Sequence, residues 1–234
     1  MLMRFHNRTE AGSMLAERLR RLAWPGPCVV LGLARGGLPV AAAIGAALQL
    51  PFDVMIVRKV GVPGYEELAM GAVASGDVEV RLPDVLAAYP GCAAAFPAAA
   101  ATALKEVHRR EQLYVRRGGR AAIEGATVIL VDDGIATGAT MLAGIRACRA
   151  RGAQRVIVAS PVVAQDTQPL LESEADGLIV LEAPAGFRAV GEWYEDFPQL
   201  EDADMIALLA AGTPASTPHA ETPRSTHRPP SQLE

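Results

Sequence analysis

The chain has 234 residues, of which 50% are hydrophobic, and this is enough for one domain with a sizeable buried core. Its 22 Lys and Arg residues against 26 Asp and Glu residues give a formal net charge of -4. The composition therefore excludes a general electrostatic attraction for nucleic acid or for an anionic membrane surface, and any anion-binding site must be local.

The cysteines and the N-terminal residues indicate the cellular compartment. Cys28, Cys92 and Cys148 are odd in number and widely spaced, which favours reduced thiols over a disulfide framework. Several charged residues interrupt the first twenty positions, so they lack the apolar core of a secretory signal. The uncharged apolar stretch of residues 93–104 is too short to cross a bilayer. We therefore expect a soluble, cytoplasmic protein with no membrane or nucleic-acid partner.

Alternating hydrophobic periods predict alternating helices and strands along the chain. The pattern begins with apolar residues at helical spacing over residues 9–23. The expected strands then cover residues 28–34, 52–60, 126–133, 154–163 and 177–183, and the further helices cover residues 38–50, 94–118, 138–152, 166–174 and 201–211. Residues 28–34 form a short apolar run without polar alternation, as expected of a parallel strand covered on both faces. The expected fold class is α/β, with a doubly wound, mainly parallel sheet flanked by helices.

Two segments depart from this alternation. Residues 61–83 contain several glycines and little periodicity, so they are interpreted as a long loop with a short strand near residues 78–81. Together with the helix that follows, they form an expected insertion over residues 61–124. Residues 212–234 contain five prolines and one apolar residue larger than alanine, which predicts a disordered tail beyond a domain of residues 1–211.

The most informative motif is VILVDDGIATGAT, residues 128–140. It places Asp132 and Asp133 at the carboxyl end of an expected strand, the edge at which open parallel sheets bind ligands. At this rim, water, a metal or sugar hydroxyls can reach the carboxylates. Small residues and two threonines then lead into a helix, whose free N–H groups favour a phosphate. Alternatively, Asp133 is only a turn residue and Thr137 only a helix cap.

Other common site motifs are absent from the sequence. There is no GxxxxGK[ST] phosphate loop, no GxGxxG dinucleotide fingerprint and no GxSxG nucleophile elbow. The four histidines, His6, His108, His219 and His227, are scattered, which argues against a zinc site.

The motif of residues 128–140 resembles the phosphoribosyl pyrophosphate (PRPP) signature of type I phosphoribosyltransferases. The resemblance implies that fold, with a small hood near residues 184–200. It also implies that Asp132 and Asp133 hold the ribose hydroxyls through charge-assisted hydrogen bonds and contact Mg²⁺ as the metal cofactor. The PRPP-binding residues that it implies are Gly36, Gly37, Asp132, Asp133, Gly134, Ala136, Thr137, Gly138, Ala139 and Thr140.

Two shorter segments agree with this resemblance in position and order. LARGG (residues 33–37) resembles the family's pyrophosphate loop, which makes Arg35 a catalytic cation, although an Arg-Gly-Gly sequence is also an ordinary turn. VRKVGVPG (residues 57–64) resembles the edge of the adenine-type catalytic loop. Arg58 and Lys59 are then further catalytic cations, or else solvated charges at a strand end. Residues 61–76 are expected to close as a lid.

The acceptor side is less specific. GFRAVGEWYEDF (residues 186–197) resembles the hood of hypoxanthine-type enzymes, so Phe187 or Trp193 is expected to stack on an acceptor base. Alternatively, both side chains pack the final helix onto the sheet. Hypoxanthine-type signatures carry an acidic residue where this chain has Ala136, whereas adenine-type signatures have alanine there.

The function that the resemblance implies is transfer of a 5-phosphoribosyl group from PRPP to a nitrogen acceptor, expected to be a nucleobase, with release of pyrophosphate. A homo-oligomer, most simply a dimer, is expected. One alternative is a PRPP-sensing regulatory or binding protein without transferase activity. Another is phosphorolysis or hydrolysis of a phosphorylated sugar in the same pocket.

Overall fold

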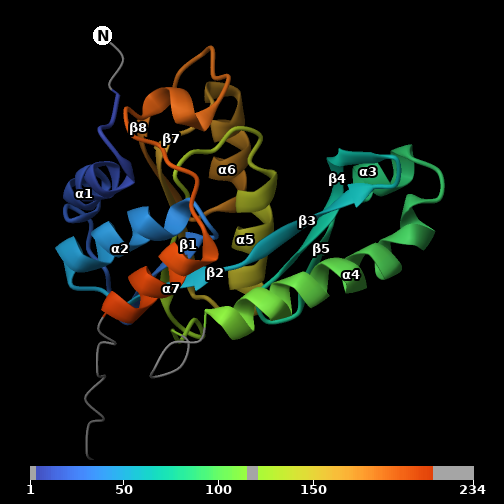
Figure 1. Cartoon of the computed structure of the whole chain (residues 1–234), viewed down its shortest axis with the longest axis horizontal. Helices are drawn as coiled ribbons and strands as arrows, with labels where there is room; N and C mark the ends of the chain where they lie inside the picture. The colour runs from blue at the N-terminus through green and yellow to red at the C-terminus, as the bar shows by residue number, and fades with distance from the viewer. Residues whose placement is uncertain (1–3, 115–120, 213–234) are drawn as a thin grey trace, which may run out of the picture.

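A five-stranded parallel sheet forms the centre of the molecule. The computed structural model describes residues 4–114 and 121–212. The strand order of this sheet is β2-β1-β6-β7-β8 (Figure 1). The bounds of the strands are β1 (Cys28–Leu33), β2 (Phe52–Met55), β6 (Thr127–Val131), β7 (Arg155–Val162) and β8 (Gly177–Glu182). All four pairings are parallel, which confirms the expected sheet.

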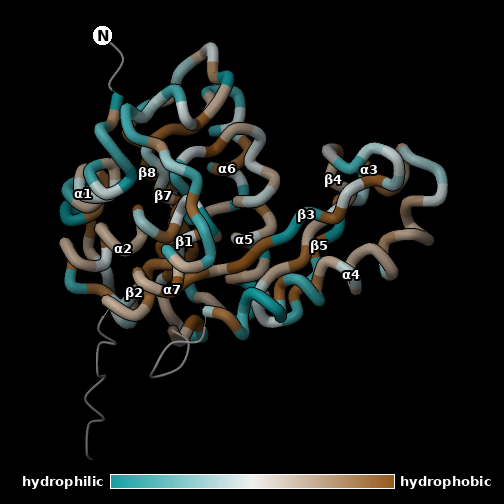
Figure 2. Tube along the Cα trace, in the orientation of Figure 1, coloured by the Kyte–Doolittle hydropathy of each residue, from teal (hydrophilic) through white to brown (hydrophobic). Residues whose placement is uncertain are grey.

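Helices cover both faces of this sheet. Alternate residues of β1 point to opposite sides: Val30 packs with α1, α2 and α7, whereas Leu31 packs with α5 and α6. Figure 2 shows that hydrophobic residues gather on the inner strands between these layers. The bounds of the helices are α1 (Arg8–Leu19), α2 (Gly37–Leu48), α5 (Ala139–Ala150), α6 (Gln168–Glu174) and α7 (Asp202–Ala211). Two covered faces explain why the strands are mostly apolar, as in β1 and the centre of β7, with few polar residues such as Asp53 and Ser160.

The strand order creates a crevice at the carboxyl ends of β1 and β6. From β1 the chain proceeds to β2 on one side, whereas from β6 it proceeds to β7 and β8 on the other. The loops that follow β1 and β6 therefore diverge, and the space between them is where open α/β sheets bind ligands.

Residues 57–113 form an arm that projects from the main body (Figure 1). The arm contains the second sheet of the structure, which is antiparallel and has the strand order β3-β4-β5. The elements of the arm are β3 (Val57–Val62), β4 (Tyr65–Ala74), β5 (Val78–Arg81), α3 (Pro83–Ala88) and α4 (Cys92–Leu113). The interpretation of residues 61–83 as a long loop is therefore wrong, although the short strand expected near residues 78–81 is present as β5. The single strand expected over residues 52–60 is also wrong, because it is interrupted at Ile56.

Glycines are placed within this small sheet for specific reasons. The pairing of β3 with β4 shifts register at Gly61, and Gly64 has a positive φ of 79° in the turn between the two strands. A Cβ atom at Gly71 would lie 2.4 Å from the Phe96 ring of α4. These glycines make a bulge, a turn and a close contact between strand and helix.

The start of the chain pairs with the hood. Phe5 forms a parallel bridge with Tyr194, and the two side chains pack in a core cluster with Trp193. Two short 3-10 helices, η1 (Gln165–Thr167) and η2 (Val190–Trp193), complete this region. Apart from Gly212, the expected disordered tail lies outside the described residues. Within residues 4–114 and 121–212, none of the helices combines the length and apolar character needed to cross a membrane.

Candidate functional site

Two glycines hold the turn after β1 against the end of β6. A Cβ atom at Gly37 would lie 2.4 Å from the backbone oxygen of Val131. A Cβ atom at Gly36 would lie 2.1 Å from Asp133 Oδ2. Because any side chain at these positions would push the turn away from the acidic pair, both residues are needed for close approach.

The two acidic residues follow β6 directly but have different surroundings. Asp133 is buried, with 8% of its surface exposed, and its Oδ2 accepts a 2.8 Å hydrogen bond from Arg8 Nε. Asp132 is half-buried, and its Oδ1 accepts a 3.0 Å hydrogen bond from the backbone N–H of Asp133. Asp132 thus lies at the open rim expected from the sequence, whereas Asp133 belongs to a buried ion pair.

The surroundings also affect the pKa values of the two acidic residues differently. Burial and the adjacent charge of Asp133 raise the pKa of Asp132 well above its ordinary value. Burial likewise raises the pKa of Asp133, but there the hydrogen bond and positive charge of Arg8 oppose the rise. An ionised Asp132 therefore gains most from a hydroxyl donor or a cation brought by a ligand.

The Thr/Gly segment forms the N-terminus of α5, as the sequence predicts. Gly138 is the N-cap with a φ of 76°, and α5 begins at Ala139. Thr167 Oγ1 donates a 2.5 Å hydrogen bond to the backbone oxygen of Ala136, which fixes the segment from behind. Thr137 is exposed. The helix start therefore offers backbone N–H groups and a reachable hydroxyl, an arrangement suited to a phosphate.

A cavity of about 470 Å³ is lined by the turn after β1 and by the acidic pair, and Thr140 is the residue of the Thr/Gly segment that lines it. One wall is the turn after β1, another is the acidic pair, and a third is the segment that follows Tyr194. Arg35 follows a cis peptide bond, and its Nη1 lies 3.7 Å from Oε2 of Glu201 at the start of α7. The lining residues are Arg8, Ala34, Arg35, Gly36, Asp132, Asp133, Thr140, Phe197, Pro198, Gln199 and Leu200.

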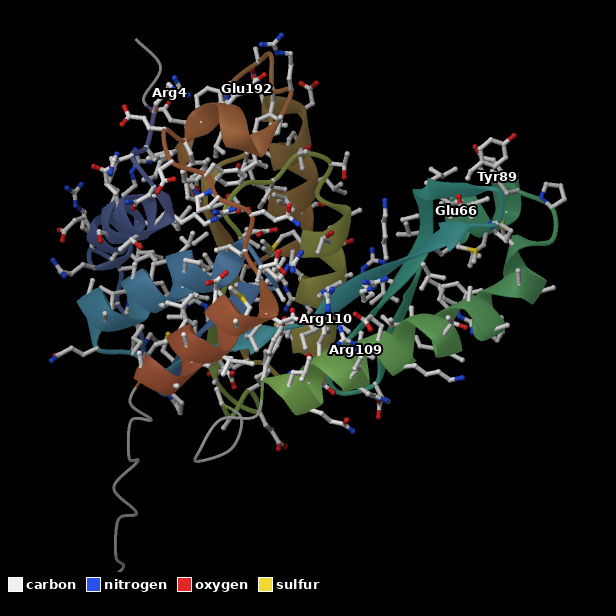
Figure 3. The ribbon with its side chains drawn as sticks, viewed as in Figure 1. Arg4, Glu66, Tyr89, Arg109, Arg110 and Glu192 are labelled. Atoms are coloured by element: carbon white, nitrogen blue, oxygen red, sulfur yellow. The ribbon has the colours of Figure 1, made fainter. Side chains whose placement is uncertain are left out.

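The predicted cations of β3 lie outside this lining. Arg58 and Lys59 are both exposed on the arm, and Lys59 borders a smaller hollow against the first turn of α5. At the same end of the arm, Arg109 lies 3.8 Å from Asp202 of α7. Figure 3 shows Arg109 and Arg110 on the part of α4 nearest the main body, with Glu66 and Tyr89 at the far end. A catalytic role for Arg58 and Lys59 stays a prediction.

The predicted acceptor aromatics also lie outside the cavity lining. Trp193 is buried in the cluster around Phe5, and Phe187 packs against the same cluster. Both side chains therefore have a packing role, but against Phe5, α1 and β7 rather than against the final helix as the alternative expected. An acceptor-binding role for either residue stays a prediction. Among the described residues, the aromatic side chain that lines the cavity is Phe197.

Three features of the cavity were missed by the sequence analysis. Arg8 reaches the site from the first turn of α1, and the Tyr194 hydroxyl donates a 2.6 Å hydrogen bond to the backbone oxygen of Asp133. Residues 197–200 form the wall opposite the acidic pair. A buried arginine requires a partner, but the sequence does not show which of its many arginines are buried.

Comparison with known proteins identifies the family. A model described as the phosphoribosyl transferase domain matches residues 5–188. The chain therefore belongs to the phosphoribosyltransferase family, and the resemblance drawn from residues 128–140 is confirmed at that level.

Two relatives are similar over most of the chain. A Mycobacterium tuberculosis H37Rv protein, Rv0571c, whose name provisionally assigns it to the phosphoribosyl transferases, is 42% identical over 205 residues, which are 88% of this chain and 46% of that protein. The chain thus spans about half the length of this relative. The crystal structure of TT1426 from Thermus thermophilus is similar with a TM-score of 0.79 and 40% identity, covering 88% of this chain and 98% of that one.

Proposed function

We propose that the protein transfers the 5-phosphoribosyl group of PRPP to a nitrogen acceptor, a nucleobase, and releases pyrophosphate. One observation carries this proposal: the glycine turn after β1 and the acidic pair after β6 meet in one cavity at the crevice of the sheet. A phosphorylated sugar with a pyrophosphate group needs donors for two anionic groups and acceptors for a diol, and this cavity provides both.

Each part of the cavity has a proposed role. The Asp132 carboxylate accepts hydrogen bonds from the ribose hydroxyls, and the start of α5 with Thr137 holds the 5-phosphate. The backbone N–H groups of Gly36 and Gly37 face the pyrophosphate, with Arg35 beside them as a counter-charge. Lys59 borders a hollow against the first turn of α5, and its proposed role is to add positive charge in the same region.

The donor set fits Mg²⁺ in its usual substrate-bound form. Among the described residues there is no group of three or more His, Cys, Asp or Glu side chains that would enclose a metal ion. Mg²⁺, however, commonly binds through one or two carboxylates, retained waters and substrate phosphates. Asp132 suits this role better than Asp133, because Arg8 already neutralises Asp133. When bound, the metal would supply positive charge to the pyrophosphate.

The chemistry is a displacement at the anomeric carbon of the ribose. The bond from that carbon to pyrophosphate breaks, and positive charge develops on the sugar ring. A bond from the carbon to the acceptor nitrogen forms, and the proton of that nitrogen passes to solvent. The contribution of the protein is to position both reactants and to balance these charges. A negatively charged Asp132 beside the ring favours the transition state, and cationic Arg35 favours the departing anion.

The test is pyrophosphate release from PRPP and Mg²⁺ with a panel of purine and pyrimidine bases. The proposal predicts release with one base and none without an acceptor. Tight PRPP binding without release would favour the sensing alternative, and release without an acceptor would favour hydrolysis. The acceptor is identified by the base that raises the melting temperature most in the presence of PRPP and Mg²⁺, since a ligand of the native state stabilises it.

A further inference from the structure

Arg8 is an unusual residue for the first turn of a surface helix. The Asn7 side chain caps α1 by accepting a hydrogen bond from the Glu10 backbone N–H. Arg8 follows immediately, but only 8% of its surface is exposed, and its side chain points into the molecule rather than into solvent. Because a guanidinium is costly to bury without partners, its contacts identify what it is for.

The guanidinium of Arg8 joins the acidic pair to the opposite wall of the cavity. Its Nε donates to Asp133 Oδ2 at 2.8 Å, and its Nη1 donates to the backbone oxygen of Pro198 at 2.9 Å. Its central carbon lies 3.8 Å from the centre of the Phe197 ring, a cation–π contact. The Arg8 side chain therefore contacts Asp133 and also two residues of the wall formed by residues 197–200.

The partners of Arg8 are themselves held in place. The Phe197 ring stacks on Tyr194 at 4.9 Å, and the Tyr194 hydroxyl donates to the backbone oxygen of Asp133. The Asp133 carboxylate also lies against Gly36, where there is no room for a Cβ atom. Moving Asp133 would therefore disturb the turn after β1, the acidic pair and the wall together.

Arg8 also determines how the two acids differ. Two adjacent carboxylates next to a buried strand repel each other, and Arg8 neutralises only the second. Asp132 is left without a cationic side chain in hydrogen-bonding contact among the described residues, and it lines the cavity.

We propose that Arg8 is a positioning residue for the candidate transfer reaction. It fixes the position of Asp133 relative to the wall of residues 197–200, and it leaves Asp132 to bind the ribose or its metal. This inference rests on the proposed function for its substrate. It assigns to the N-terminal helix a part in the site that its sequence does not indicate.

The test compares Arg8→Met, Arg8→Lys and a control, Arg18→Met, in the full chain. Arg18 lies on the same helix and donates to the backbone oxygen of Val180, away from the cavity. Arg8→Met is expected to weaken PRPP binding in the presence of Mg²⁺ by about 10- to 100-fold, the usual loss when a supporting partner is removed from a binding group. Arg8→Lys should recover part of this loss, because a lysine restores the charge beside Asp133 but not the fork that also reaches Pro198.

Hydrogen exchange without any ligand separates this proposal from the proposed function. Arg8→Met should increase amide exchange in residues 132–137 and in residues 194–200 together, whereas Arg18→Met should increase neither. An increase confined to α1 would overturn the positioning role. So would an Arg8→Met variant that binds PRPP as tightly as a PRPP-binding wild-type protein does. If the wild-type protein fails to bind PRPP, the proposed function fails, and the exchange result alone decides whether Arg8 couples the two walls.

Discussion

Replacing Gly36 by alanine is expected to damage the site far more than the fold. Gly36 has φ -62° and ψ -35°, a right-handed conformation that alanine adopts readily. The added methyl group, however, would lie 2.1 Å from Asp133 Oδ2 and 2.4 Å from its Cγ. Because Cβ atoms essentially never approach a heavy atom within 3.0 Å, the carboxylate or the turn must move by about 1 Å.

The size of the effect follows from this displacement. Overpacking of a close contact costs about 1–3 kcal/mol, and the lower chain entropy of alanine offsets about 0.4–1 kcal/mol of that cost. The free energy of unfolding should therefore fall by only about 1–2 kcal/mol. A displacement of about 1 Å among groups that align a substrate can reduce the rate about 100-fold, and we expect a loss of similar size in kcat/KM.

Two assays and one control measure this separation of effects. Urea unfolding gives the stability, and pyrophosphate release with PRPP and Mg²⁺ gives kcat/KM. Gly186→Ala is the matched control, because a Cβ atom at Gly186 meets nothing within 4 Å. It should change stability by less than about 0.5 kcal/mol. Unaltered kcat/KM in Gly36→Ala would refute the argument that the turn after β1 and Asp133 form one rigid unit.

Further substitutions separate the parts of the site. Asp133→Asn should lower the free energy of unfolding by about 3–5 kcal/mol, measured by urea unfolding, because it leaves the Arg8 cation buried without its anion. Asp133 is thus buried in an ion pair rather than open at the rim as expected from the sequence. Asp132→Asn should leave stability unchanged or raise it, since it removes a poorly compensated charge, but should abolish calorimetric PRPP binding. Thr137→Val should weaken that binding about tenfold without affecting stability, as expected for one hydrogen bond to a charged group. Tyr194→Phe should cost about 1–3 kcal/mol in urea unfolding, because the Asp133 carbonyl loses its buried donor.

The sequence predicted the parallel sheet well because strands that are buried on both faces contain runs of apolar residues, and such runs can be recognised from the local sequence alone. The strand β1 is an uninterrupted apolar run, and β6 and β7 have apolar centres at residues 128–131 and 156–159. Each strand was expected within a few residues of its observed bounds. The acidic pair and the threonine segment were also placed correctly at the end of β6, since that placement depends only on the strand and helix that flank them.

The antiparallel arm was missed because its signals are those of a loop. Gly61, Gly64 and Gly71 lower the strand propensity of residues 57–74, but the structure uses them for a bulge, a turn and a contact with Phe96. The conformation of such a segment is determined by strand pairing and helix packing, and both depend on residues that are distant in the sequence.

The hood was expected near residues 184–200, but the part of Phe197 in the cavity lining was missed for a similar reason. Trp193 and Phe187 are the more obvious stacking candidates from their position in the hood motif, yet Phe197 lines the cavity. Nothing near Phe197 in the sequence shows that its partner is Arg8, which lies 189 positions earlier and is identified only by the fold.

The distance along the chain between Arg8 and Asp133 has a consequence for biosynthesis. The two residues of the ion pair are 125 positions apart, so a ribosome makes the cation long before its counter-ion. Until β6 emerges, α1 carries an arginine whose native partner has not yet been synthesised, and the chain cannot form the ion pair beside the cavity. We therefore expect maturation of the pocket to follow, rather than accompany, synthesis of the first half of the polypeptide, and nascent chains that stop short of β6 to depend on chaperones.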